Sequence, residues 1–369
     1  MRYAMIMAGG SGTRLWPMSV KTLPKQLIPF ITCGGGQTKS LLQIAMDRLD
    51  GFLPDEQLFV CAGESTRGVM LDKLPKLTPD RFIGEPTGRD TLNAVGLTAA
   101  VLHRLDPDAV FAVFTADHII EPVAQFQQIV QRGFELAERG EPTLVTFGVA
   151  PTHAACGYGY LQLGDALNDN ASVVSEFKEK PEQAVAEQYF HAGPSKYLWN
   201  SGMFVWKASS VLAAIEKFAP KNHAKLVELG QAWGTPGYDA KIAEVYPTLD
   251  KISVDFAIME PASTDADFTV AAVPMPLKWL DVGSWPSFAE TLDPDGSGNC
   301  CSGTKSVHVD SKNVLVVGDD ASHVVATLGC EDLIVIHTKN ATLVCPHDQA
   351  ERIKELHRAV GEQAGPDYL

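Results

Sequence analysis

Cysteine is scarce in this sequence, and none of it is arranged as Cys-x-x-Cys. Only seven cysteines occur among 369 residues, and their number is odd. This pattern does not favour a zinc site or a disulfide framework, so we expect reduced, buried thiols. Long hydrophobic runs are also missing, because no apolar stretch approaches the ~20 residues of a membrane span. The N-terminus has no basic segment before a long apolar core, which argues against a secretory signal and for a cytoplasmic protein.

Positive charge is in deficit. The chain has 30 Lys and Arg residues against 45 Asp and Glu, which gives a formal net charge of −15. Such a charge argues against nucleic acid or an anionic membrane as a partner. It would also repel a nucleotide, so a nucleotide site would need local cations and a divalent metal. The composition is that of an ordinary globular protein, long enough for one large domain and a smaller one.

What the sequence does have is a distinctive N-terminal stretch, Met1 to Gln26. It begins with an apolar run, Tyr3 to Ala8, which is typical of a buried parallel strand. Glycines follow at once, and they allow sharp turns and bring bare N–H groups close to phosphate oxygens. Two cations, Arg14 and Lys25, flank a segment that prolines stiffen. The stretch therefore predicts a phosphate-binding loop formed by Gly9, Gly10, Ser11, Gly12 and Thr13.

Two common phosphate-loop motifs do not fit this stretch. A dinucleotide-binding fingerprint requires a glycine where Leu15 stands and an acid about twenty residues further on, whereas the first acid is Asp47. A Walker-type loop ends in Gly-Lys-Ser or Gly-Lys-Thr, whereas this loop continues as Gly12-Thr13-Arg14. An NAD-dependent oxidoreductase is therefore excluded, and a Walker-type loop is not supported.

Apolar runs and amphipathic segments alternate beyond the loop. The runs predict strands at Leu58–Ala62, Val110–Thr115 and Thr143–Val149, with helices between them. This alternation predicts right-handed βαβ units and an α/β fold with a doubly wound, mostly parallel, Rossmann-like sheet. Ligands bind such sheets at the carboxyl ends of the strands. Asp117 follows the predicted strand Val110–Thr115, and the glycine loop follows the predicted strand Tyr3–Ala8. Both therefore lie at carboxyl ends of strands, and we expect them at one site.

The rest of the chain is more mixed. Ser253–Glu260 predicts a short helix, and Trp279–Trp285 predicts a turn. Asp293–Gly303 is rich in Gly, Asp, Pro and Ser and predicts a linker. We therefore expect a large domain over residues 1–292 and a C-terminal module over residues 293–369. Short strands in that module predict a partial β-helix, followed by a terminal helix from about His347 to Val360.

The motifs together resemble those of sugar nucleotidylyltransferases, and Trp16-Pro17 resembles the mannose-1-phosphate guanylyltransferase branch of that family. Each motif alone is weak, but their order and spacing are specific. The chain ends at Leu369, so we expect it to lack the isomerase domain of longer bifunctional relatives. Besides the N-terminal loop, the motifs are Glu85–Thr91, Ala116–His118, Gly157–Tyr160, Glu179–Pro181, Trp199–Phe204, Ser253–Asp255 and Trp279–Trp285.

The resemblance implies a nucleotide-diphospho-sugar transferase fold and a transfer of GMP from GTP to mannose 1-phosphate. The products would be GDP-mannose and pyrophosphate. The attacking phosphate oxygen is already an anion at neutral pH, so catalysis would depend on positioning and charge neutralisation. Two alternatives stay open: the same chemistry with another sugar 1-phosphate or another nucleoside triphosphate, and a non-catalytic regulatory subunit that only binds nucleotide sugar.

The resemblance also implies roles for individual residues. The segment Ala8–Thr13 would bind the phosphates, Arg14 would contact the β- and γ-phosphates, and Lys25 would stabilise charge near the α-phosphate. Asp117 and Asp281 would hold Mg²⁺, a hard cation that prefers oxygen ligands. The nucleotide base would lie at a loop containing Glu85, Gly88 and Arg89. The sugar phosphate would contact Gly157, Glu179, Lys180 and Asn200.

Two residues depart from the pattern usual in the family. Asp90 stands where Asn is usual, and Cys156 stands where Thr is usual. The first adds an anion near the expected base loop, and the second removes a hydroxyl near the expected sugar loop. Members of the family often self-associate, so we expect a homodimer, with the C-terminal module as a candidate interface.

Overall fold

The computed structural model describes residues 1–10, 12–29, 31–32, 38–140, 142–167 and 170–369. The chain folds into two compact units, and each is assembled from three segments of sequence. Among the residues that the structure describes, none of the helices combines the length and the apolar surface that a bilayer span requires. Unit 1 contains Met1–Gly9, Met46–Thr115 and Ile120–Trp279, and unit 2 contains Gly10–Ala45, Ala116–Ile119 and Leu280–Leu369.

Unit 1 is built on a nine-stranded mixed sheet with the order β5-β4-β1-β6-β11-β8-β12-β10-β9. The strands β5, β4, β1 and β6 are parallel, and Met5 lies opposite Phe59 on one side and Val113 on the other. β8 and β12 are also parallel, whereas β11 runs antiparallel to β6 and β8. The strands are β1 (Arg2–Met7), β4 (Leu58–Gly63), β5 (Phe82–Glu85), β6 (Val110–Thr115), β8 (Thr143–Val149), β9 (Tyr160–Leu167), β10 (Ala171–Lys178), β11 (Tyr197–Lys207) and β12 (Thr269–Pro274).

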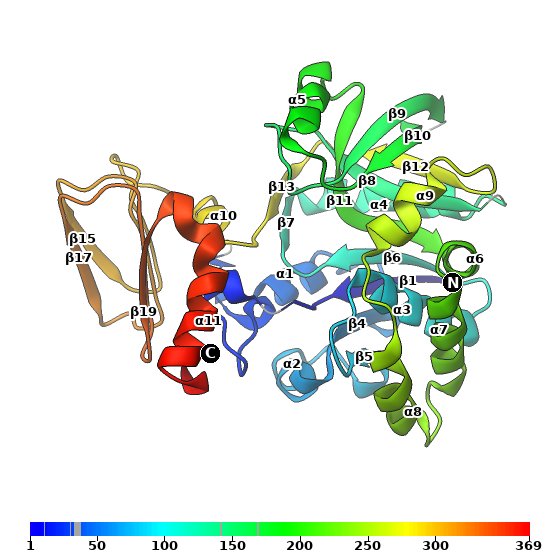
Figure 1. Ribbon diagram of the computed structural model, residues 1–369, viewed down its shortest axis with the longest axis horizontal. Helices are drawn as coiled ribbons and strands as arrows, with labels where there is room; N and C mark the ends of the chain where they lie inside the picture. The colour runs from blue at the N-terminus through cyan, green and yellow to red at the C-terminus, as the bar shows by residue number, and fades with distance from the viewer. Residues whose placement is uncertain (11, 30, 33–37, 141, 168–169) are drawn as a thin grey trace. The chain divides into compact units, whose positions relative to one another are not determined.

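Helices cover both faces of this sheet (Figure 1). Val113 of β6 belongs to the same buried cluster as Leu92 of α3, and α3 packs against α6 and α7. The next residue, Phe114, packs its ring against Phe126 of α4. Because successive side chains on a strand point to opposite faces, α4 covers the other face. The helices are α2 (Arg67–Lys73), α3 (Thr91–Leu105), α4 (Val123–Ala137), α5 (Gln183–Ala192), α6 (Ala208–Phe218), α7 (Pro220–Ala232), α8 (Tyr238–Val245) and α9 (Glu260–Ala262).

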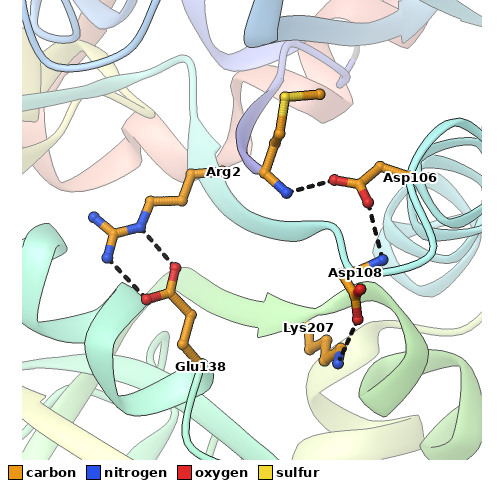
Figure 2. Close-up of polar contacts among 6 residues, drawn as sticks. Arg2, Asp106, Asp108, Glu138 and Lys207 are labelled. Carbon is orange, nitrogen blue, oxygen red and sulfur yellow. Dashed lines mark hydrogen bonds and ion pairs between the residues drawn. The ribbon is translucent and has the colours of Figure 1, made fainter.

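Exposed ion pairs lie at the amino ends of β1 and β6 (Figure 2). The Arg2 guanidinium donates to both carboxylate oxygens of Glu138, at 2.7 and 2.9 Å. The N-terminal amine pairs with Asp106, and Lys207 Nζ lies 3.1 Å from Asp108 Oδ1. Exposed pairs of this kind contribute about 0–1 kcal/mol each, so they only tie the strand ends together. They occupy the edge opposite the carboxyl ends, where open α/β sheets bind ligands.

Unit 2 contains the C-terminal β module. β14, β16 and β18 are parallel neighbours, and Val316 of β16 lies opposite Cys301 on one side and Val335 on the other. β15 and β17 form a second parallel pair, so successive windings of the chain stack as in a β-helix, which confirms the predicted β module. The elements are β2 (Ile31–Thr32), β3 (Thr38–Lys39), α1 (Leu41–Asp47), α10 (Trp285–Ala289), β14 (Cys300–Ser302), β15 (Lys305–Val309), β16 (Leu315–Gly318), β17 (Val324–Leu328), β18 (Leu333–His337), β19 (Thr342–Pro346) and α11 (Ile353–Gln363).

The core of unit 2 joins the segment after the glycine loop to the β module. Trp16 and Trp285 are buried in one apolar cluster with Leu315 of β16 and Ile353 of α11. The indole N–H of Trp285 donates to the Trp16 carbonyl at 3.1 Å, and the indole N–H of Trp16 donates to the Tyr368 carbonyl at 2.7 Å. The segment that carries Arg14 and Lys25 is therefore anchored by buried side chains rather than held by the prolines alone.

Some local predictions were wrong. The predicted turn at Trp279–Trp285 begins instead as a strand, β13 (Lys278–Asp281), and ends in α10. The strand that pairs with it, β7 (His118–Glu121), was not predicted. The thiols are not uniformly buried, since Cys156 and Cys301 are exposed, although the six described cysteines are all free.

Candidate functional site

Gly12 shapes the loop of unit 2 on which the two predicted catalytic cations lie. It adopts φ +60°, a left-handed conformation, immediately before a 3-10 turn (η1, Thr13–Leu15). A Cβ added there would collide with the Ser19 hydroxyl and come within 3.0 Å of Lys25 Cβ. A glycine is therefore required both by the backbone conformation and by the close approach of Lys25. Ser11, which we expected in this loop, lies outside the described residues.

Lys25 makes a short polar contact with Asp117. Its ammonium Nζ lies 2.6 Å from Asp117 Oδ2, and the two side chains are only 11% and 25% exposed. Burial on its own would raise the pKa of Asp117, but Lys25 and His118 outweigh it and hold that pKa below its usual value. Asp117 is therefore an anion, and one of its two carboxylate oxygens is already paired with the Lys25 ammonium.

Asp281 lies beside Asp117. The Val282 N–H donates to the Asp117 carbonyl at 2.9 Å, which fixes the two segments side by side. Burial raises the pKa of Asp281, and repulsion from Asp117 raises it further against the opposing charge of His118 and Lys25. Two carboxylates that repel each other in a half-buried place are stabilised by a cation.

The donor set at this place suits a divalent metal. One ligand atom each from Asp117, His118 and Asp281 lies within 4.8 Å of the others. The His118 Nε2 is 3.9 Å from Asp117 Oδ1, so the oxygen not used by Lys25 faces the imidazole. The reaction that the resemblance implies would use such a metal. Mg²⁺ in proteins typically takes one or two carboxylates and completes its shell with water and substrate phosphate. The residues present fit that requirement.

Arg14 is held by an acid from the C-terminal part of unit 2. Its Nε lies 2.9 Å from Glu351 Oε2, and the Arg14 side chain is 37% exposed. Glu351 belongs to a 3-10 segment (η8, His347–Arg352) directly before α11. An anionic ligand that used Arg14 would have to compete with this carboxylate.

A second polar cluster lies in unit 1 at the end of β10. Glu179 is buried, at 5% exposure, and accepts a hydrogen bond from Lys180 Nζ at 2.6 Å. Burial opposes the charged form of Lys180, but Glu179 and Asp255 raise its pKa above the usual value. Lys180 also adopts φ +43°, an unusual backbone conformation for a residue with a side chain. Such conformations are retained where the surroundings hold a side chain in one direction.

Asn200 is fixed in this cluster from both ends of its amide. Its Oδ1 accepts from the Thr146 hydroxyl at 2.7 Å, and its Nδ2 donates to Asp255 Oδ1 at 2.8 Å. Its backbone N–H donates to the Gly159 carbonyl at 2.8 Å. The orientation of the amide is thus set by these partners, and one N–H and one lone pair stay available for a ligand.

Asp255 is the residue of this cluster that sequence reasoning missed as a site residue. Burial and the neighbouring Glu179 raise its pKa to about 7, despite the opposing charge of Lys180. It begins a π-helical turn (η7, Asp255–Met259). Such turns are frequent at functional sites. The motif Ser253-Val254-Asp255 was noted in the sequence, but its distance along the chain from Asn200 hid the contact.

The predicted base loop of unit 1 is organised around Glu85. The Tyr246 hydroxyl donates to Glu85 Oε1 at 2.6 Å. Asp90 adopts φ 68° and accepts from the Thr91 N–H, which caps α3. Arg89 donates to the carbonyl of Pro247, so its guanidinium is engaged by the protein itself.

Of the remaining predicted residues, Gly88 and Gly157 lie in exposed loops of unit 1, whereas Ala8 is buried. Gly88 and Gly157 are exposed, and a Cβ at either would meet open space. Cys156 donates its thiol to Gln183 Oε1 at 3.0 Å. Ala8 is buried directly after β1, and its N–H donates to the Cys61 carbonyl at 2.8 Å. The backbone N–H of Ala8 is therefore already used within the sheet.

Comparison with known proteins identifies relatives of this chain. Residues 3–296 match the family described as nucleotidyl transferase, and residues 304–359 match the MannoseP isomerase/GMP-like beta-helix domain. The chain is 35% identical to mannose-1-phosphate guanylyltransferase of Klebsiella pneumoniae, covering 99% of this chain and 75% of that protein. It is 34% identical to the Escherichia coli K12 protein of the same name, covering 96% and 72%. A crystal structure described as mannose-1-phosphate geranyltransferase from Thermus thermophilus is similar with 29% identity and a TM-score of 0.83, covering 97% and 99% of the two chains.

Proposed function

Since the chain belongs to the nucleotidyl transferase family, we propose that it transfers GMP from GTP to mannose 1-phosphate, giving GDP-mannose and pyrophosphate. The observation that carries this proposal is the similarity to mannose-1-phosphate guanylyltransferases, at 34–35% identity over nearly the whole chain. Nucleoside triphosphates and sugar phosphates are the substrate kinds of the family. What we propose beyond the family is the identity of the nucleotide base, guanine, and of the sugar, mannose.

The chemistry that must be supplied is mainly electrostatic. A phosphate oxygen of the sugar phosphate attacks the α-phosphorus of GTP, the bond from that phosphorus to the bridging oxygen breaks, and pyrophosphate leaves with the electron pair. Both reactants are anions, and the net charge of the chain is −15. Catalysis therefore needs local cations that bring the anions together and stabilise the leaving group.

In the proposed assignment, unit 2 supplies these cations. Backbone amides of Gly9–Thr13 bind the phosphates, Arg14 contacts the β- and γ-phosphates, and Lys25 stabilises charge near the α-phosphate. Asp117 and Asp281 hold Mg²⁺, which would offset the negative charge of the triphosphate when bound. The Lys25–Asp117 contact at 2.6 Å supports this grouping, because it places the lysine ammonium beside the proposed metal ligand.

The sugar phosphate is assigned to the cluster of unit 1. Lys180 binds its phosphate, Glu179 accepts hydrogen bonds from the sugar hydroxyls, and the Asn200 amide both donates to and accepts from them. Gly157 allows close approach of the loop, and Glu85, Gly88 and Arg89 form the base loop. The buried and fully oriented amide of Asn200 supports this assignment, since a preorganised group binds a ligand with less ordering cost.

The experiment is a substrate panel. The purified chain is given each of four nucleoside triphosphates with several sugar 1-phosphates and Mg²⁺, and nucleotide sugar is measured. The fastest product is expected from GTP and mannose 1-phosphate. Faster turnover with UTP or dTTP would assign another base, and binding of GDP-mannose without turnover would assign a regulatory subunit.

We also propose that the chain forms a homodimer, with residues 1–292 as the catalytic domain and residues 293–369 as the β module. Sedimentation of the purified chain tests the dimer directly. A monomer at every concentration would remove it from the account.

A further inference from the structure

A buried tyrosine from outside the predicted base loop contacts the acid of that loop. Tyr246 is fully buried, in a 3-10 turn (η6, Tyr246–Thr248) that follows α8. Its hydroxyl donates to Glu85 Oε1 at 2.6 Å, although the two residues are 161 positions apart. A contact this short to a carboxylate is a strong, charge-assisted hydrogen bond. One oxygen of Glu85 is thus already occupied.

The second oxygen of Glu85 faces the start of the glycine loop. Glu85 ends β5, Gly9 follows β1, and β4 lies between these two parallel strands. A Cβ added at Gly9 would be 3.8 Å from Glu85 Oε2. Because Gly9 has no side chain, it leaves that oxygen uncovered by its own atoms. The two oxygens therefore differ: Oε1 is anchored, and Oε2 is presented at the carboxyl edge of the sheet.

From this arrangement we propose that Tyr246 is a positioning residue for base selection, which keeps Glu85 charged and turned so that Oε2 accepts hydrogen bonds from guanine. The proposal rests on the proposed function, because it takes GTP as the nucleotide. Guanine presents two donors on its Watson–Crick edge, N1–H and the 2-amino group, and a carboxylate is an acceptor-only group. Adenine presents an unprotonated nitrogen at the first of these positions, which a carboxylate repels.

The pKa of Glu85 is shifted by its burial and by two neighbours from different elements. Burial raises the pKa of Glu85, the Tyr246 hydrogen bond lowers it, and the negative charge of Asp90 raises it. Cys61 on β4 faces the same carboxylate, and burial together with Glu85 keeps its thiol protonated by raising its pKa. Tyr246 is thus the neighbour that favours the charged acid, and Asp90 is the neighbour that opposes it.

This opposition supplies a matched pair of variants. Tyr246→Phe removes the hydroxyl and keeps the ring, and Asp90→Asn removes the anion and keeps an amide oxygen that can cap α3. Tyr197→Phe is the control, because it removes a half-buried hydroxyl that contacts Gln162 at 3.2 Å on the same sheet. Thermal melting of each variant checks that it folds.

The measurement is equilibrium binding of GTP, ITP and ATP at about pH 6 and about pH 8. Tyr246→Phe should weaken GTP binding about tenfold or more at the lower pH, less at the higher pH, and leave ATP unchanged, since a hydrogen bond to a charged group is lost. The advantage of GTP over ITP, which lacks the 2-amino group, should shrink with it. Asp90→Asn should make GTP binding less sensitive to pH than in the wild type.

Equal losses for GTP and ATP in Tyr246→Phe would assign the hydroxyl a structural role only and overturn the proposal. An unchanged preference for GTP in that variant would overturn it as well, and so would a wild type that binds ATP as tightly as GTP. Transfer of GMP by the wild type is measured in parallel. Turnover without a Tyr246 effect refutes this inference alone, whereas GTP-selective binding without turnover refutes the proposed function alone.

Discussion

Lys25 Nζ lies 2.6 Å from Asp117 Oδ2, although 92 positions separate the two residues. Both belong to unit 2, where Asp117 Oδ1 faces His118 at 3.9 Å and Asp281 completes a group of metal-binding side chains. The Asp117 carboxylate thus contacts the Lys25 ammonium with one oxygen and faces the candidate metal site with the other.

The Asp117→Asn variant tests the metal site. It keeps the size of the side chain and removes the charge that pairs with Lys25, so turnover with Mg²⁺ should fall at least about a hundredfold. Steady-state rates at saturating GTP and mannose 1-phosphate measure this. Glu362→Gln, which removes the same charge from an exposed position on α11, should leave the rate unchanged. Full activity of Asp117→Asn would exclude Asp117 from the site.

Gly12→Ala tests the geometry of the loop. The added Cβ would meet Ser19 and Lys25, and its φ of +60° costs a non-glycine residue on the order of 1 kcal/mol. The midpoint of unfolding should fall because of the strain. Activity should also fall at temperatures where the variant is folded, because Lys25 is displaced. Gly10→Ala is the matched comparison, since Gly10 also has a positive φ but open space around it. Similar activity losses in both variants would argue that backbone strain, and not Lys25, is responsible.

Glu351→Gln tests the hold on Arg14. Removing the carboxylate that lies 2.9 Å from Arg14 should free the guanidinium for an anion and lower the KM for GTP several-fold. The change in KM should shrink as salt is added, because the contact is partly exposed. A raised KM would indicate instead that Glu351 orients Arg14 for its ligand.

Lys180→Ala tests the sugar-phosphate assignment. The loss of its charge should raise the KM for mannose 1-phosphate far more than the KM for GTP. Lys221→Ala, an exposed lysine on α7, is the charge-matched control and should change neither. Equal increases for both substrates in Lys180→Ala would refute the assignment.

Asp255→Asn tests the buried charge of unit 1. The pKa of Asp255 is raised to about 7 in the folded chain from the 3.8 of an unperturbed carboxyl, so the folded form binds the proton more tightly. Wild-type stability should therefore fall as the pH rises from about 4 to about 7. The stability of the variant relative to wild type should increase over that window by roughly 2–4 kcal/mol and then level off. Denaturant unfolding at several pH values measures it, and a difference that does not change with pH would refute the shift.

Local patterns predicted much of the fold. The apolar run Tyr3–Ala8 forms β1, and Val110–Thr115 forms β6, because a buried parallel strand needs few polar residues. The strands β7 and β13 were missed because they are short and begin or end in polar residues that resemble a turn. Their pairing depends on contacts between distant segments, which no local pattern contains.

The candidate site also contains residues that local motifs indicate and residues that only long-range contacts reveal. The glycines, Arg14, Lys25, Asp117 and Asp281 were singled out through motifs, and the structure places Lys25, Asp117 and Asp281 close to one another. The partners that adjust these groups were not found. Glu351, Tyr246 and Asp255 contact residues far away in the sequence. Glu351 and Tyr246 lie in segments with no motif of their own, and the motif that contains Asp255 gave no sign of its contact with Asn200.

Phosphorus NMR of the purified chain with GTP, mannose 1-phosphate and Mg²⁺ tests the central claim most directly. Attack at the α-phosphorus predicts that the signals of GDP-mannose and pyrophosphate grow together, in equal amounts, as GTP disappears, and that Asp117→Asn abolishes both. Conversion of GTP to GDP and inorganic phosphate, or no change in GTP while another nucleoside triphosphate yields pyrophosphate, would contradict the account.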